Sequence, residues 1–176
     1  MKRIISAFLC AAIFSYILAF SEGFFPKTYA QANTELTEQA LYCLQGVGVD
    51  VGFAEKEQIT RAEFIMLLMK TAYKDPINVP LGTVFQDVDN SAEYANSIYN
   101  AYAKGIVTKA NFFRPDEAIS LRDAVTAIMR ALGYGGAADL KGGYPQGYMY
   151  WANQSKLLNH ISKGEVQSLN GQDALL

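Results

Sequence analysis

Three short patterns place side chains that could do chemistry at the starts of helices. The first pairs Thr60 with Glu63 and encloses Arg61. In such a capping box the hydroxyl accepts one free backbone N–H and the carboxylate accepts another. A guanidinium in the first helical turn can also hold a carboxylate through two parallel hydrogen bonds, close to free backbone N–H groups. A guanidinium at the position of Arg61 thus has the chemistry to hold an acidic group.

Two later patterns repeat the same cap. Ser120 and Asp123 are spaced as the second capping box, and Asn170 and Asp173 as the third. Each is expected to begin a helix, as Thr60 and Glu63 do. Three boxes in register are hard to obtain by chance and indicate an internal repeat.

Catalysis is not expected from these residues. Glycosidases need two carboxylates across a cleft, but Glu63 and Asp123 are already explained as capping partners. The sequence has no Ser/His/Asp set, phosphate loop or metal cluster, and His160 has no neighbour at metal-ligand spacing. The alternation of Asp87, Asp89, Ser91 and Glu93 lacks the glycine and the final glutamate of a calcium loop. We expect no enzyme, no metal and no cofactor.

Composition narrows the class of partner. The 176 residues carry a net charge of −2 and are 51% hydrophobic, which suits a compact domain. A nucleic-acid partner would need a basic face, so none is expected. The 11 Tyr and 10 Phe are numerous for this length, and exposed ones would suit contacts with sugars or proteins.

The N-terminus has the layout of a secretory signal peptide. Lys2 and Arg3 precede an uncharged run from Ile4 to Phe20, and an A-x-A site ends at Ala32. We expect residues 1–32 to be removed and the mature chain to begin at Asn33, the alternative being an uncleaved membrane anchor. Removal of Cys10 would leave Cys43 alone, without a disulfide and as a small core residue.

The interior spacing of the chain predicts repeated helix–loop–helix units. Helices are expected over 35–44, from 60 to the low 70s, over 119–132 and over 148–157. A further helix is expected after Val88 and is expected to end near Gly105. Gly46, Gly105 and Lys156 end the helices that precede the three caps, at separations of 14, 15 and 14 residues. Lys156 would be strained if that position needs a positive φ. Asp87 is expected to cap a turn or to hold the backbone at 90–91.

These patterns together resemble S-layer homology (SLH) repeats of exported bacterial proteins. The resemblance rests on Phe85-Gln86-Asp87-Val88, Gly105-Ile106-Val107, Phe113-Arg114-Pro115 and the helix start from Ile59 to Glu63. It covers roughly residues 36–176. It implies an all-α fold in which three helix–loop–helix units form a pseudo-threefold bundle. The units would be 33–83, which is partial, then 84–140, and 141–176, which is truncated.

The resemblance also implies a ligand and the residues that bind it. In the family, grooves between the units bind secondary cell-wall polysaccharide that often carries pyruvylated sugar, and the arginine matching Arg61 contacts the acidic sugar. The second unit departs from this motif, because Leu121 takes the matching position and Arg122 comes one residue later, about 100° around the helix. The third unit has Gly171 there.

The function expected is non-covalent anchoring to the bacterial cell wall, at the surface of the secreting cell. The alternative is an exported structural or protein–protein assembly module that keeps the fold and no longer binds glycan. The expected partners are an acidic or pyruvylated wall polysaccharide and other exported proteins, with no membrane contact after signal cleavage. Trp151 is either a stacking platform for a sugar ring or a core aromatic. The candidate glycan-binding residues are Thr60, Arg61, Glu63, Arg122 and Trp151.

Overall fold

The computed structural model describes residues 29–46, 48–73 and 84–176. All but seven of these belong to one compact unit, Leu36–Leu176, and Tyr29–Glu35 belong to a separate one. The predicted signal peptide lies almost wholly outside the described residues. Within them, no helix combines the length and apolar character needed to cross a bilayer.

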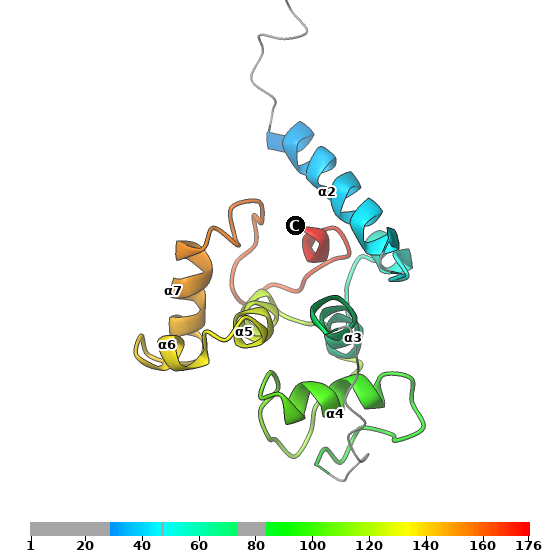
Figure 1. The fold of residues 1–176 in the computed structure, drawn as a ribbon, viewed down its shortest axis with the longest axis vertical. Helices are drawn as coiled ribbons and strands as arrows, with labels where there is room; N and C mark the ends of the chain where they lie inside the picture. Colours follow the sequence, from blue (N-terminus) through cyan, green and yellow to red (C-terminus); the bar gives the residue numbers. More distant parts are fainter. Residues whose placement is uncertain (1–28, 47, 74–83) are drawn as a thin grey trace, which may run out of the picture. The chain divides into compact units, whose positions relative to one another are not determined.

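The described residues form helices and connections without a β-strand, which confirms the predicted all-α class (Figure 1). The α-helices are α2 (Tyr29–Gly46), α3 (Arg61–Ala72), α4 (Ala95–Ala103), α5 (Leu121–Ala131), α6 (Gly135–Asp139) and α7 (Gln146–Gln154). Two short 3₁₀ helices, η1 (Gly52–Glu55) and η2 (Asp173–Leu175), complete the set.

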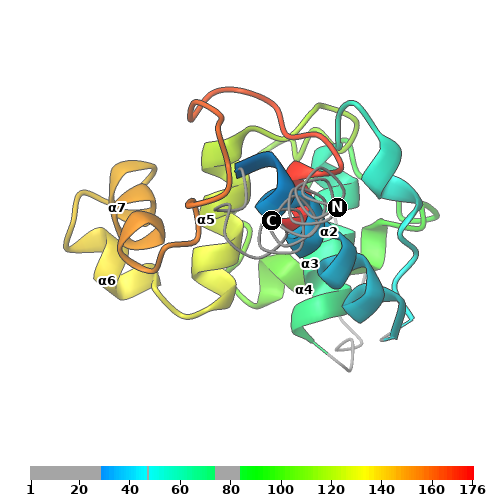
Figure 2. The same ribbon diagram turned by 90° about the horizontal axis from the view of Figure 1, so that it is seen from above.

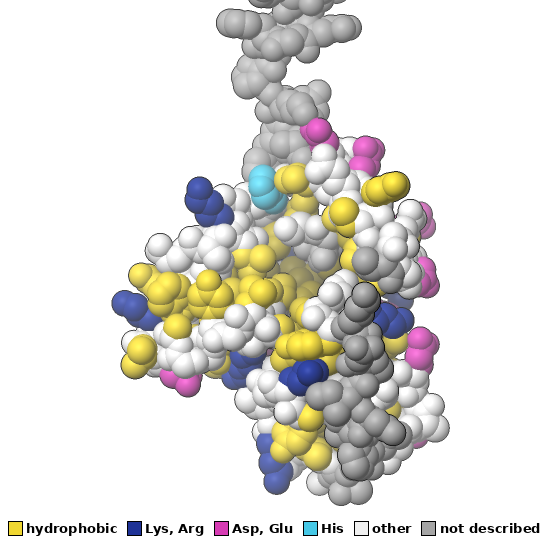
Figure 3. Space-filling view, in the orientation of Figure 1, with side chains coloured by type: hydrophobic (Ala, Val, Ile, Leu, Met, Phe, Trp, Pro, Cys, Tyr) yellow, Lys and Arg dark blue, Asp and Glu magenta, His cyan; other side chains and the backbone are white. Residues whose placement is uncertain are grey.

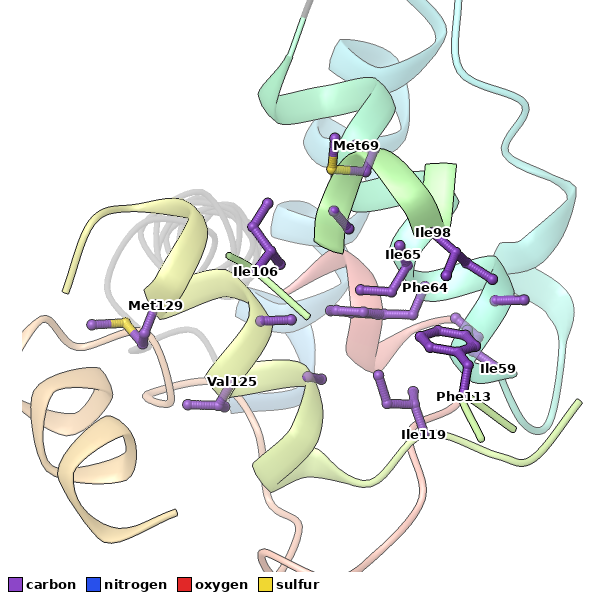
Figure 4. Close-up of a cluster of buried hydrophobic side chains, with 14 of the residues drawn as sticks. Ile59, Phe64, Ile65, Met69, Ile98, Ile106, Phe113, Ile119, Val125 and Met129 are labelled. Carbon is purple, nitrogen blue, oxygen red and sulfur yellow. The ribbon is translucent and has the colours of Figure 1, made fainter. Parts of the chain in front are cut away.

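Helices α3 and α5 pack against each other, and each has a further helix packed on it. Helix α4 packs on α3, while α7 packs on α5 and holds α6 against itself, as Figures 1 and 2 show from two directions. Buried side chains from these helices and their connections form one continuous hydrophobic core. In the close-up of this core, Ile59, Phe113 and Ile119 lie in one cluster (Figure 4).

A closed ring of three backbone hydrogen bonds joins the residues that precede the caps. The N–H of Ile59 donates to the carbonyl of Leu169 at 3.0 Å, Leu169 donates to Ile119 at 3.0 Å, and Ile119 donates to Ile59 at 2.9 Å. All three side chains are at most 3% exposed. The ring brings residues from three distant parts of the sequence to one place, where each turns into a helix.

Two of the three predicted capping boxes are complete. Thr60 Oγ1 accepts from Glu63 N–H at 3.2 Å, and Glu63 Oε2 accepts from Thr60 N–H at 3.0 Å. Asn170 and Asp173 exchange the same pair of bonds at 2.8 Å each, although only the single turn η2 follows within the chain.

The capping box predicted at the start of α5 is only half formed. The prediction was wrong for the bond expected from the carboxylate of Asp123. Ser120 Oγ accepts from Asp123 N–H at 3.3 Å, as expected. The carboxylate of Asp123 does not return to Ser120, because it accepts from Arg61 and Tyr144 instead. A charged donor forms a stronger hydrogen bond with a carboxylate than a neutral backbone N–H does.

The ends of the helices follow the sequence prediction closely. Gly105 has φ +73° after α4, and Lys156 has φ +62° after α7. Lys156 therefore takes the left-handed conformation that Gly105 takes at the matching position. A residue with a Cβ is strained there, as predicted.

The prediction for Cys43 was wrong. Cys43 is exposed, and Leu36 on the same helix is 37% exposed. The apolar spacing along α2 predicts a buried face, but among residues 33–46 it is Thr37 that is buried. Burial of α2 depends on which neighbouring elements cover it, and helical spacing alone does not contain that information.

Candidate functional site

A groove of about 870 Å³ opens between the first turn of α3, the connection from 106 to 119, and the first turns of α5. Tyr144, from the connection before α7, lies at its edge. The groove has both apolar and charged walls. Its apolar lining consists of Ile65, Phe85, Ile106, Val107, Ala110, Phe112, Phe113, Ala118, Ile119 and Ala127.

Positive charge predominates along this groove. Its basic lining residues are Arg61, Arg114, Arg122 and Arg130, and its acidic ones are Glu117 and Asp123. The chain as a whole is slightly acidic, with a net charge of −2. The excess of guanidinium groups is therefore a local feature, and it favours an anionic ligand.

Arg61 is held in place by three contacts. Its Nε donates to the carbonyl of Phe113 at 2.9 Å, and its Nη1 donates to Oδ2 of Asp123 at 3.1 Å. Its guanidinium carbon lies 5.2 Å from the centre of the Phe113 ring, within the range of a cation–π contact. Arg61 thus joins α3, the 106–119 connection and α5 at the wall of the groove.

Asp123 links Arg61 to Tyr144. The Tyr144 hydroxyl donates to Oδ1 of Asp123 at 2.6 Å, while Arg61 is bound to the other oxygen. Burial raises the pKa of Tyr144, and the hydrogen bond to Asp123 raises it further, against the opposing charges of Arg122 and Arg61. Tyr144 therefore stays protonated and keeps its hydroxyl as a donor at neutral pH.

Arg122 lines the same groove despite its shifted position in the sequence motif. Its backbone N–H donates to the carbonyl of Glu165 at 2.9 Å, which fixes the start of α5. Its Nε is buried and has no hydrogen-bond acceptor among the described residues.

Two arginines of the groove were not among the predicted site residues. Arg130 donates from Nε to the Tyr148 hydroxyl at 3.0 Å and from Nη1 to the Ile106 carbonyl at 3.3 Å. Arg114 is exposed, has φ +62°, and lies 3.7 Å from the carboxylate of Glu117. The Phe113-Arg114-Pro115 motif was a signal for Arg114, whereas Arg130 follows only from the packing of α5 on α7.

The turn that carries Arg114 is held by Asp87. The carboxylate of Asp87 accepts from Phe113 N–H at 2.8 Å and from Arg114 N–H at 2.6 Å. The prediction that Asp87 holds the backbone at 90–91 was wrong, because Asp89 accepts from Ser91 N–H at 2.8 Å. Asp87 instead reaches a segment 26 residues later, which local spacing does not show.

The remaining predicted site residues lie outside the groove lining. Thr60 and Glu63 form the cap of α3, and Glu63 also pairs with Lys56. Trp151 is partly buried between Tyr134 and Tyr150, with ring centres at 5.8 and 5.3 Å. Its Nε1 is buried without an acceptor in the described part of the chain. Of the five predicted residues, the structure brings Arg61 and Arg122 together.

No group of three or more His, Cys, Asp or Glu side chains among the described residues is placed to hold a metal ion. The groove presents guanidinium groups, one phenol and two carboxylates, and the carboxylate of Asp123 is occupied by Arg61 and Tyr144. The arrangement is suited to holding a polar, acidic ligand by hydrogen bonds and apolar contact.

Comparison with known proteins points to one domain family. A curated "Surface layer protein" of Brevibacillus choshinensis is 23% identical over 95% of this chain, and the match spans 16% of that protein's length. The S-layer homology domain family matches residues 84–125. This stretch contains Asp87, the turn at Phe113 and Arg114, and the start of α5 with Arg122. With both the sequence match and the helical fold around it, the chain contains an S-layer homology domain at residues 84–125.

Proposed function

We propose that this chain anchors non-covalently to the bacterial cell surface by binding secondary cell-wall polysaccharide in the groove between α3 and α5. The observation that carries the proposal is the gathering of four arginines around a groove of about 870 Å³ in an otherwise slightly acidic chain. Guanidinium groups match the planar geometry of carboxylates, which an acidic or pyruvylated sugar supplies.

The apolar part of the groove suits the sugar ring itself. Phe112 lines the groove and is 53% exposed, and Tyr144 at the edge is 48% exposed. Aromatic faces pack against the C–H faces of sugars, while the polar groups bind their hydroxyls. Phe112 and Tyr144 therefore take the stacking role that the sequence suggested for Trp151.

The proposal also covers where the chain acts and how its three units work together. The chain works outside the cell, at the wall, after export directed by residues 1–32. Units 33–83, 84–140 and 141–176 act as one anchor, because the hydrogen-bond ring of Ile59, Ile119 and Leu169 takes one residue from each unit. The relative from Brevibacillus choshinensis is named a surface layer protein, which agrees with a place at the surface.

A second function has an observation in its favour. Hydrophobic side chains are exposed over α5, α6 and α7 (Figure 3). Leu132, which follows α5, is 63% exposed, and Leu140, which follows α6, is 87% exposed. Exposed apolar patches of this kind occur at protein–protein interfaces. On this alternative, the chain is an assembly module of the cell surface and its groove has lost the glycan ligand.

Sedimentation with purified cell walls separates the two functions. The full chain, expressed in a bacterium that processes its N-terminal segment, is mixed with sacculi that retain their secondary polysaccharide and with sacculi stripped of it. Anchoring predicts co-sedimentation with the first sample only, weakened by salt because ion pairs carry the binding. A folded chain that stays in the supernatant with both samples would contradict the glycan proposal and favour the assembly module.

A further inference from the structure

We infer that Arg122, and not Arg61, makes the direct contact with the acidic group of the ligand, while Arg61 and Asp123 form a support that fixes the wall of the groove. The inference rests on the proposed function for the identity of the ligand. The assignment of the two arginines comes from their different surroundings in the same groove.

Arg61 already has the partners that a ligand would offer. Its contacts with Asp123 and with the carbonyl of Phe113 use donors on two sides of the guanidinium, and the Phe113 ring covers one face. The side chains of Arg61 and Asp123 are only 26% and 28% exposed. Turning Arg61 toward a ligand would leave a partly buried carboxylate and a carbonyl without their donor, which is unfavourable.

Arg122 is in the opposite situation. Its side chain has no hydrogen bond or ion pair with any described residue, and its Nε is withdrawn from water. A buried donor without an acceptor is rare in folded proteins, because its desolvation is uncompensated. An oxygen atom of a ligand in the groove would satisfy this donor and would pair with the charge.

The other charged groups of the groove leave this role to Arg122. Arg130 donates to Tyr148 and Ile106, and Arg114 lies beside Glu117 at the exposed edge. The carboxylate of Asp123 offsets the charge of Arg61. Among these arginines, Arg122 is the one with a buried side-chain donor that lacks an acceptor in the described part of the chain, and it lies next to Asp123 in the sequence.

A set of two matched variants tests the assignment. Arg122→Met removes the guanidinium and keeps a side chain of similar length. The double variant Arg61→Met/Asp123→Asn removes both partners of the support, so that neither charge is left unpaired. We measure the affinity of each full chain for sacculi that carry their polysaccharide, with thermal unfolding by circular dichroism to establish that each variant is folded.

The inference predicts an asymmetric result. Arg122→Met lowers the affinity about tenfold or more, because a direct charge-assisted contact is lost. The double variant lowers the affinity less than Arg122→Met does, because the ligand does not touch the support and only the fixed position of the groove wall is lost. Arg122→Lys, which keeps the charge and loses the planar fork, falls between wild type and Arg122→Met. Loss of affinity in the double variant with full affinity in Arg122→Met would overturn the inference.

A second measurement does not depend on the cell wall. The Nε–Hε resonances of Arg122 and Arg61 are followed by nuclear magnetic resonance while pyruvate is added to the wild-type chain. The inference predicts a saturating shift for Arg122 and a smaller one for Arg61. A shift confined to Arg61 would overturn the inference. If the wild-type chain shows the Arg122 shift but does not bind sacculi, only the proposed polysaccharide ligand is overturned.

Discussion

Arg61 and Asp123 join the first turns of α3 and α5 by an ion pair, with Nη1 of the arginine 3.1 Å from Oδ2 of the aspartate. The two residues are 62 positions apart in the sequence. Each occupies a site that the repeat pattern assigns to a different unit, and their contact crosses the groove wall. The same pair therefore joins the two units at the groove and adds no net charge to it.

Asp123→Asn should destabilise the chain through the loss of this pair. The two side chains are about three-quarters buried, so the effect is expected between that of exposed pairs and that of buried ones, about 1–2 kcal/mol. Urea unfolding at neutral pH measures the change. The partner left behind, Arg61, would then have no carboxylate to offset its charge.

Glu117→Gln is the matched control for this prediction. It removes the carboxylate of the Arg114–Glu117 pair, whose side chains are 64% and 61% exposed and whose charged atoms are 3.7 Å apart. Solvent screens such a pair, so the free energy of unfolding should change by less than about 0.5 kcal/mol. Equal losses of unfolding free energy in both variants would show that partial burial does not make the Arg61–Asp123 pair stronger than an exposed pair.

Local sequence rules predicted much of the fold and less of the groove. The caps at Thr60 and Asn170 and the helix end at Gly105 depend on residues within four positions, and the structure confirms all three. The carboxylates of Asp87 and Asp123 were assigned to neighbours in the sequence. Both bind donors from distant segments, which spacing along the chain does not reveal.

The arginines also show that local sequence rules predict only part of the groove. Arg61 was predicted from a motif, and it does lie in the groove, but its pairing with Asp123 depends on how α3 packs on α5. Arg130 reaches the groove from the third turn of α5, where the sequence has no binding motif. A groove between helices takes residues from several turns of each, whereas a motif marks only the first turn.

Lys156→Gly should stabilise the chain. Lys156 has φ +62° and is exposed, so its side chain contributes little in exchange for the strain of the left-handed conformation. Glycine removes the strain but adds freedom to the unfolded chain, which leaves an expected gain of about 0.5–1 kcal/mol in urea unfolding.

The reverse change at the matching position is the control for Lys156. Gly105 has φ +73° and nothing lies within 4 Å of an added Cβ, so Gly105→Ala tests backbone strain without a steric clash. It should lower the free energy of unfolding by about 1 kcal/mol. A stabilising effect at Gly105, or a loss of stability in Lys156→Gly, would contradict the assignment of both residues to strained helix ends.

Gly171→Ala should disturb the contact between the last turn of the chain and the first unit. A Cβ at Gly171 would lie 2.0 Å from the carbonyl oxygen of Phe53, and the backbone of Ala54 is also too close. Because backbone must move to relieve the clash, we expect a loss of about 1–3 kcal/mol. Hydrogen exchange should also show faster exchange of the Ile59 amide, which donates to Leu169 in the ring.

Gly136→Ala is the control for the clash at Gly171. Gly136 lies in α6 with nothing within 4 Å of an added Cβ. Alanine is the better helix former, so the free energy of unfolding should stay the same or rise by up to about 1 kcal/mol. Unchanged stability and unchanged Ile59 exchange in Gly171→Ala would mean that the last turn does not hold the ring together.

Glu63 should make the stability of the chain fall at acid pH. Burial would raise the pKa of Glu63, but the hydrogen bonds from Lys56 and from the Thr60 backbone and the charge of Lys56 together hold the pKa below its ordinary value of 4.5. Since the folded state has the lower pKa, this stabilisation is fully present above the ordinary value. It is lost as the pH falls through the folded value, where the carboxylate takes up a proton.

Glu63→Gln isolates this contribution. Glutamine still offers an oxygen to the Thr60 N–H but has no charge to attract Lys56, so the variant should be less stable than wild type at pH 7. The difference should shrink as the pH falls below the ordinary pKa, because protonated Glu63 then resembles glutamine. Urea unfolding of both chains from pH 7 to about pH 3 measures this convergence. The stability of Lys56→Met should lie between those of wild type and Glu63→Gln, since this change removes the Lys56 contact and leaves the cap in place. Parallel curves of unfolding free energy against pH for wild type and Glu63→Gln would refute the linkage.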